Sequence, residues 1–211
     1  MSEDEKFTCE GVCYTHEDVQ KQQTHLFLKA PLICQIQLET LYLALEFSMK
    51  PTYNLKNRIM NIGDKAPEVL GINEKGEEIL LSNYQGKKVV LYFYPKDNTS
   101  GCTAEACSLR DNYSDLKEKG YEVIGVSTDS ATSHQKFIAK HELPFTLIAD
   151  TDKKLVEAMG VWGEKSMCGK KYMGTFRTTF LLNEEGIVEK VFSPKEVKTK
   201  THGEQILKVI E

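Results

Sequence analysis

The feature that most constrains the fold of this chain is an apolar run that passes through a proline and a short polar loop into a helical stretch. Residues 87–94 read KKVVLYFY, the β-branched and aromatic composition of a strand buried on both faces. Pro95 ends the run. The loop KDNTSG then leads into a helix that we expect over about residues 103–119, stopped by Gly120. A buried strand that leads into a helix in this way indicates an α/β layer fold.

The alternation of strands and helices continues to the end of the chain. We expect further strands over residues 69–72, 78–81, 122–127, 145–149, 176–182 and 187–192. We expect further helices over residues 131–141, 151–159 and 202–210, the first capped by Asp129 or Ser130. The last two strands flank Asn183-Glu184-Glu185-Gly186, which is typical of a hairpin turn. This order predicts a mixed central β-sheet flanked by helices.

Residues 1–59 differ in character from residues 60–211. They open with a charged stretch and contain FTCEGVCYTH, followed by an apolar patch over residues 26–47 that is broken by polar residues. The patch fits a strand and a helix equally well, because short apolar runs are ambiguous. We therefore expect an irregular N-terminal extension followed by one domain over residues 60–211.

Composition and charge exclude several classes of function. The formal net charge is −4 and basic residues form no block, which argues against nucleic acid as the main partner. No run of 18 apolar residues exists, so we expect no membrane partner. The acidic start MSEDEKFT does not resemble a secretory signal. Six cysteines without such a signal indicate thiols of a reducing compartment, and we expect the cytoplasm.

The chemistry is concentrated in residues 95–107, PKDNTSGCTAEAC. Cys102 lies at the junction of loop and helix, in the first helical turn. Unpaired backbone N–H groups and the positive end of the helix dipole favour a thiolate at such a position, and the thiolate is the nucleophilic form. On position alone, Cys102 could instead be a small buried apolar residue, since free cysteines are usually buried.

The surrounding motifs favour a catalytic cysteine. Residues 60–211 resemble the peroxiredoxins of the AhpC/TSA type, and most closely their bacterioferritin-comigratory or peroxiredoxin Q class. The motif Pro-x-x-x-Thr-x-x-Cys is present as Pro95, Thr99 and Cys102, directly after LYFYP. GVWGEK at 160–165 and Arg177 in FRTTFLL also match. One departure is Ser100, where relatives commonly carry proline; the change removes no reacting group.

The resemblance implies a thioredoxin-like fold and the reduction of hydrogen peroxide or organic hydroperoxides without metal, haem or other cofactor. Cys102 would attack the peroxide and become a sulfenic acid. Arg177 would supply a fixed positive charge for the thiolate and for the peroxide oxygens. The Thr99 hydroxyl would bond the thiolate or the peroxide, and Pro95 would shield the sulfur. Without the resemblance, Thr99 reads as an ordinary loop hydroxyl and Pro95 as a strand terminator.

Cys107 occupies the position at which this class places its resolving cysteine. On one intact helix, the Cα atoms of Cys102 and Cys107 would be about 8.6 Å apart. A disulfide usually requires Cα atoms within about 7 Å. Formation of the disulfide would therefore require unwinding of the first helical turns. The alternative is that Cys107 is only a buried residue on the helix face.

The resemblance further implies recycling by thioredoxin or a similar dithiol reductant, and we expect a monomer. Two other functions remain open. A thioredoxin-type thiol–disulfide oxidoreductase would need Cys-x-x-Cys, whereas this chain has four residues between Cys102 and Cys107. A non-enzymatic redox sensor could use the same cysteine to signal to a partner protein.

Other candidate residues carry weaker signals. Cys168 is an alternative resolving thiol. Cys9, Cys13 and His16 have a loosely zinc-like spacing, but no matching fourth ligand is adjacent, so we expect no metal site. Cys34 has no assigned role.

The remaining expectations concern packing. We expect Glu105 to complement the helix dipole and not to be catalytic. We expect His134 and His141 on the exposed face of a helix, and Trp162 in core or loop packing.

For residues 1–59 we favour an artefact of the choice of start codon, with translation beginning at Met60, over an appendage that docks on the domain or on a partner.

Overall fold

The computed structural model of the chain describes residues 7–9, 12–14, 59–167 and 169–210. The chain forms two compact units, Met1–Tyr53 and Asn54–Glu211. In the first unit, β1 (Phe7–Cys9) and β2 (Val12–Tyr14) pair as an antiparallel hairpin. His16, Cys34 and the apolar patch at 26–47 lie outside the described residues, so the expectations about them stay untested.

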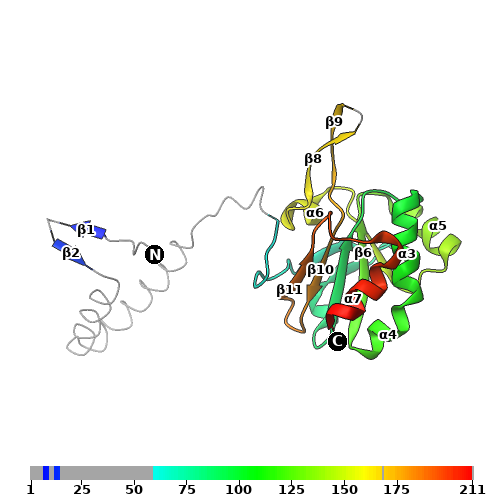
Figure 1. Ribbon diagram of the computed structural model, residues 1–211, viewed down its shortest axis with the longest axis horizontal. Helices are drawn as coiled ribbons and strands as arrows, with labels where there is room; N and C mark the ends of the chain where they lie inside the picture. The colour runs from blue at the N-terminus through cyan, green and yellow to red at the C-terminus, as the bar shows by residue number, and fades with distance from the viewer. Residues whose placement is uncertain (1–6, 10–11, 15–58, 168, 211) are drawn as a thin grey trace. The chain divides into compact units, whose positions relative to one another are not determined.

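The second unit is built on a five-stranded sheet with the order β11-β10-β5-β6-β7 (Figure 1). Its strands are β5 (Lys88–Phe93), β6 (Tyr121–Ser127), β7 (Thr146–Ala149), β10 (Thr178–Leu182) and β11 (Val188–Phe192). Strands β5, β6 and β7 are parallel, whereas β10 pairs antiparallel with both β5 and β11. The predicted mixed α/β sheet is therefore confirmed.

Helices occur where the periodic pattern predicts them, with one difference. The described helices are α3 (Ser100–Asp111), α4 (Tyr113–Glu118), α5 (Ala131–His141), α6 (Lys154–Ala158) and α7 (His202–Ile210). The single helix expected over about 103–119 is wrong: it is divided at Asn112, and it begins at Ser100. The side chain of Asn112 donates to the Ser108 carbonyl (2.9 Å), a backbone acceptor in the last turns of α3. Side-chain bonds of this kind compete with the continuation of a helix.

The core has two layers, one on each face of the sheet. Alternate residues of β5 point to opposite faces: Val89, Leu91 and Phe93 belong to one cluster, and Val90 and Tyr92 to the other. The first cluster includes buried residues of α6, and the second includes buried residues of α3, α4, α5 and α7. Both faces of β5 are covered, as its continuous apolar composition predicts.

Two hairpins and two short 3-10 turns complete the unit. Strands β3 (Val69–Ile72) and β4 (Glu78–Leu80) form the expected hairpin, followed by η2 (Leu81–Tyr84), and η3 (Thr199–Thr201) precedes α7. Strands β8 (Trp162–Met167) and β9 (Lys170–Thr175) form a second hairpin, which projects beyond the sheet (Figure 1). We did not expect this hairpin from the sequence. Its strands, WGEKSM and KKYMGT, are largely polar and show no regular alternation of apolar and polar residues in the sequence.

Two packing expectations have opposite outcomes. Trp162 is half-buried and packs against the core, as predicted. The expectation that His134 and His141 are exposed is wrong, because His134 is completely buried and His141 is half-buried. His134 makes three polar contacts within the protein, which offset the cost of removing an imidazole from water.

None of the described helices has the length and apolar composition needed to cross a bilayer.

Candidate active site

The register of the central strands places Cys102 beside a segment that is distant in the sequence. Strand β5 ends at Phe93, and the chain passes through the loop of residues 94–99 into α3, where Cys102 lies in the first turn. Strand β10 runs antiparallel to β5, with Thr178 paired to Phe93. Arg177, one residue before β10, is therefore at the same end of the sheet as the start of α3.

The guanidinium of Arg177 joins Cys102 to a carboxylate on the same helix. Its Nη2 donates to Cys102 Sγ (3.2 Å), and its Nη1 donates to Glu105 Oε2. Cys102 and Glu105 are three residues apart and so lie on one face of α3. Cys102 is 1% exposed, and the Arg177 side chain is 18% exposed. The planar fork of an arginine suits this double contact, because two of its N–H groups can bond different partners at once.

Glu105 is a fully buried carboxyl that lies beyond the first turn of α3, so the expectation that it complements the helix dipole is wrong. Burial raises the pKa of Glu105 to about 7, although the charge and the hydrogen bond of Arg177 act to lower it. Its second oxygen, Oε1, has no hydrogen-bond partner, and His202 Nε2 is 4.0 Å away. His202 is itself buried and shares a hydrogen bond of 2.8 Å with Thr179 Oγ1. Burial lowers the pKa of His202 to about 4, and the nearby charge of Arg177 adds to this effect.

A second cation, Lys165 on the projecting hairpin, interacts electrostatically with Arg177 and Cys102. Lys165 on β8 donates from Nζ to the Thr175 carbonyl (3.0 Å). Burial lowers the pKa of Lys165, and so does the charge of Arg177, whereas Cys102 acts in the opposite direction. The GVWGEK motif therefore contributes a positive charge that acts on Cys102 through the electrostatic field.

Comparison with known proteins identifies the family. Residues 62–191 match the model of the AhpC/TSA family. This chain belongs to the AhpC/TSA family of peroxiredoxins. It is 46% identical over 152 residues to peroxiredoxin Bcp of Bacillus subtilis, which covers 72% of this chain and 96% of the relative. It is 46% identical over 117 residues to peroxiredoxin Bcp of Escherichia coli, which covers 56% of this chain and 74% of the relative.

Solved structures agree with the sequence comparison. A structure of Xanthomonas campestris peroxiredoxin Q is similar with a TM-score of 0.61 and 37% identity, covering 66% of this chain and 87% of that one. A mutant of Xylella fastidiosa PrxQ is similar with a TM-score of 0.66 and 32% identity, covering 73% and 97%. The expected thioredoxin-like fold is confirmed, and the protein is a thiol peroxidase.

In this peroxiredoxin, the loop before α3 holds Pro95 and Thr99 in different surroundings. Pro95 is half-buried and follows the strand end. Thr99 is exposed, and its hydroxyl donates to the Lys96 carbonyl (3.1 Å). The Thr99 hydroxyl is thus engaged by the loop backbone and not by Cys102.

The second cysteine of the predicted pair lies on the same helix. Cys102 and Cys107 both belong to α3, and both are free thiols. Cys107 is half-buried. The alternative resolving thiol, Cys168, lies outside the described residues. On an intact helix the two α3 cysteines are too far apart to be bridged, so this peroxiredoxin has the geometry of the reduced state.

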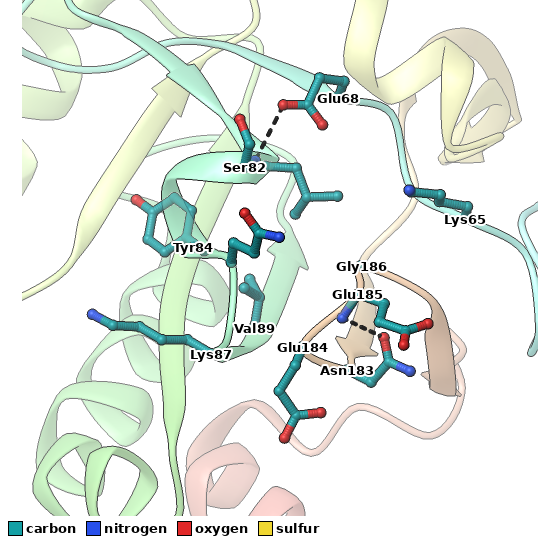
Figure 2. A pocket seen from close by; sticks show the side chains of 12 residues that line it. Lys65, Glu68, Ser82, Tyr84, Lys87, Val89, Asn183, Glu184, Glu185 and Gly186 are labelled. Atoms are coloured by element: carbon teal, nitrogen blue, oxygen red, sulfur yellow. Dashed lines mark hydrogen bonds between the residues drawn. The ribbon is translucent and has the colours of Figure 1, made fainter.

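Two surface cavities have linings that do not include Cys102. One cavity of about 340 Å³ is lined by Lys87 and Val89, at the start of β5, and by Asn183–Gly186 after β10 (Figure 2). Cys102 follows the other end of β5. A second cavity of about 570 Å³ is lined by residues of β3, β4 and α6 among others. Neither lining includes Cys102 or Arg177.

Two parts of the site escaped the sequence reasoning. A charged residue three positions after Cys102, on the face of α3 that enters the core, is a signal that could have identified Glu105 as a buried partner. No pattern pointed to His202, because its neighbours are brought together only by the packing of α7 on α3. Gly203 allows that close packing: its N–H donates to Ser108 Oγ (3.0 Å), and a Cβ there would be 2.5 Å from the Ser108 carbonyl.

Proposed function

We propose that Cys102 is the peroxidatic cysteine, that Arg177 stabilises its thiolate and the transition state, and that Cys107 resolves the oxidised form. The observation that carries the proposal is the 3.2 Å contact between Arg177 Nη2 and Cys102 Sγ at the start of α3. It combines a fixed cation with the positive end of a helix at one sulfur atom.

In the first step, the Cys102 thiolate attacks the terminal oxygen of a hydroperoxide. The S–O bond forms as the O–O bond breaks, and the leaving alkoxide or hydroxide takes a proton to give an alcohol or water. Cys102 is then a sulfenic acid. The Arg177 guanidinium is aimed at the sulfur, so it also faces the oxygen on which negative charge develops. Glu105 orients this guanidinium from within the helix, and Lys165 adds positive charge.

Thr99 and Pro95 shape the entrance to the sulfur. We assign Thr99 to the binding of the incoming peroxide, for which its hydroxyl must leave the Lys96 carbonyl. The free-energy cost of breaking that hydrogen bond is small, because the Thr99 side chain is exposed and its hydroxyl rotates freely. Pro95 limits the access of water to Cys102 from the loop side.

In the second step, the thiol of Cys107 attacks the sulfur of the Cys102 sulfenic acid. A disulfide forms and one water molecule leaves. Because both residues lie on α3, the first turns of the helix must unwind before the sulfur atoms can meet. A dithiol reductant of the thioredoxin type then returns both cysteines to thiols by disulfide exchange.

The working form that we propose is a monomer in the cytoplasm, recycled by thioredoxin, with residues 60–211 as the catalytic domain. Support for the reducing compartment is that catalysis requires the repeated reduction of both thiols of α3.

The decisive experiment is Cys102→Ser, with Cys34→Ser as the matched control. Peroxide consumption is measured with thioredoxin, thioredoxin reductase and NADPH. We expect Cys102→Ser to lose all but a few per cent of the activity while its circular dichroism spectrum stays native, because serine is not ionised near neutral pH. Cys34→Ser should remain active. Substantial turnover by Cys102→Ser would remove this residue from the mechanism.

A further inference from the structure

The loop before the catalytic cysteine carries a buried acidic residue that takes no part in the chemistry described above. Asp97 lies two residues after Pro95, and its side chain is 2% exposed. Its Oδ1 accepts a hydrogen bond from Tyr94 Oη (2.8 Å), and its Oδ2 accepts from Ser133 Oγ (2.7 Å). Burial acts to raise the pKa of Asp97, but the hydrogen bonds of His134 and Ser133 outweigh burial and hold it below its ordinary value. Asp97 is thus a buried carboxylate.

The partner of Asp97 is a histidine that is completely buried on α5. His134 Nδ1 is 2.9 Å from Asp97 Oδ2, and His134 Nε2 is 3.1 Å from the Ile148 carbonyl oxygen. His134 thus links the loop residue Asp97 to the backbone of β7. The pair is a hydrogen-bonded clamp between the loop and α5.

The backbone of the loop is fastened at the same residue. The N–H of Asp97 donates to Asp129 Oδ2 (2.7 Å), and that oxygen also accepts from Ser127 Oγ (3.1 Å) at the end of β6. The following residue, Asn98, has a left-handed backbone with φ 57° and turns the chain toward α3. Residues up to Asp97 are therefore tied to β6 and α5, whereas α3 begins only three residues later.

We propose that the Asp97–His134 pair is a positioning device that keeps the first turns of α3 wound and so sets the competition between the two fates of oxidised Cys102. The unwinding needed for the disulfide must begin in the segment directly after Asp97. A clamped Asp97 restricts that segment, because its start cannot move with it. Loss of the clamp increases the population of the unwound form, from which Cys107 reaches Cys102.

The two fates differ in their chemistry and in their products. In the wound form, the Cys102 sulfenate can attack a second hydroperoxide; sulfur gains one oxygen to become a sulfinate, and the peroxide is reduced to an alcohol or water. In the unwound form, the Cys107 thiol attacks the sulfenic acid, and the disulfide and water are formed. An intact clamp slows the disulfide and exposes the enzyme to overoxidation. This inference rests on the roles proposed above for Cys102 and Cys107.

The first test compares Asp97→Asn with the full-length wild-type chain. The rate of disulfide formation is followed by stopped-flow fluorescence after one equivalent of hydrogen peroxide, and sulfinic acid is measured by mass spectrometry across a peroxide series. A shift of about tenfold in the wound-to-unwound ratio, equivalent to about 1.4 kcal/mol, should speed the disulfide step about tenfold. The peroxide concentration that gives half-maximal sulfinic acid should rise in parallel.

A second variant distinguishes a specific effect on the disulfide step from a general loss of stability. In Asp97→Ala/His134→Leu both members of the pair are removed together, so neither is left in the core without the other. This double variant should fold and should show the same acceleration of the disulfide step. Val188→Ala on β11, buried and far along the sheet from the loop, provides a control that lowers the melting temperature without touching the clamp.

The outcomes separate the inference from the proposed function. If the clamp variants only melt earlier, like Val188→Ala, and form the disulfide within twofold of the wild-type rate, the pair is structural and the inference is wrong. If wild-type protein forms no Cys102–Cys107 bridge at all, the proposed resolving role fails first. Acceleration in both clamp variants, absent from the control, supports the positioning role.

Discussion

Arg177 Nη2 lies 3.2 Å from Cys102 Sγ although 75 residues separate the two in the chain. The contact exists because β10 pairs antiparallel with β5, so the residue before β10 meets the loop that follows β5. The same guanidinium bonds Glu105, which is on the helix of the cysteine. One cation therefore links the sheet to α3 at the reacting atom.

Replacement of Arg177 should slow the reaction of Cys102 with peroxide. Arg177→Met removes the cation and both donors, and loss of one such donor costs on the order of 100-fold in rate in other enzymes. Arg177→Lys should recover only part of the rate, because an ammonium group cannot reproduce the planar fork between Cys102 and Glu105. The second-order rate constant is measured by stopped flow. An unchanged constant in Arg177→Met would contradict the role.

Ionisation of Glu105 should make stability depend on pH. Burial raises its pKa from 4.5 to about 7, so the folded protein binds a proton that the unfolded chain releases. The stabilisation from this proton is complete below about pH 4.5 and is lost as the pH rises through about 7. Relative to Glu105→Gln, the wild type should lose unfolding free energy over this range, by at most about 1.4 kcal/mol per pH unit.

Urea unfolding of both proteins between pH 4.5 and 8 measures this difference. The exposed Glu185 offers a matched control, since Glu185→Gln should follow the wild-type curve. A pH-independent difference between wild type and Glu105→Gln would show that Glu105 stays ionised across the range.

Removal of the resolving thiol should separate the two chemical steps. Cys107→Ser should react with the first equivalent of peroxide at the wild-type rate, because Cys102 and Arg177 are unchanged. Its turnover with thioredoxin should fall strongly, since no intramolecular disulfide forms. Mass spectrometry of oxidised wild-type protein should show a Cys102–Cys107 bridge. A Cys102–Cys168 bridge in its place would assign the resolving role to Cys168.

A chain that begins at Met60 should retain the peroxidase activity. The Met60 N–H donates to the Met159 carbonyl (3.2 Å), and its side chain packs against the core, so the domain is already tied at this residue. We expect full activity and nearly the same melting temperature as for the full-length chain. A decrease of several degrees would instead favour an N-terminal segment that docks on the domain.

The sequence alone was sufficient for most of the local structure and for the position of Cys102. Strand β5 and helix α5 were predicted because their patterns extend over many residues and are bounded by Pro95 and by the cap of Ser130, whose Oγ accepts from the Ser133 N–H (3.3 Å). Cys102 was located because a helix start is a local property. The hairpin of β8 and β9 was missed, because its polar strands carry no burial pattern.

Tertiary structure decided which side chains meet. The pairing of β10 with β5 selects Arg177 as the partner of Cys102, and only packing reveals that Glu105 and His134 are buried. The identity of a polar residue does not show whether its side chain faces water or the core. Its environment depends on strand register and helix packing, which join residues far apart in the chain. For this reason the local pattern predicted Cys102 and the family resemblance added Arg177, but neither indicated that Glu105 and His134 are buried.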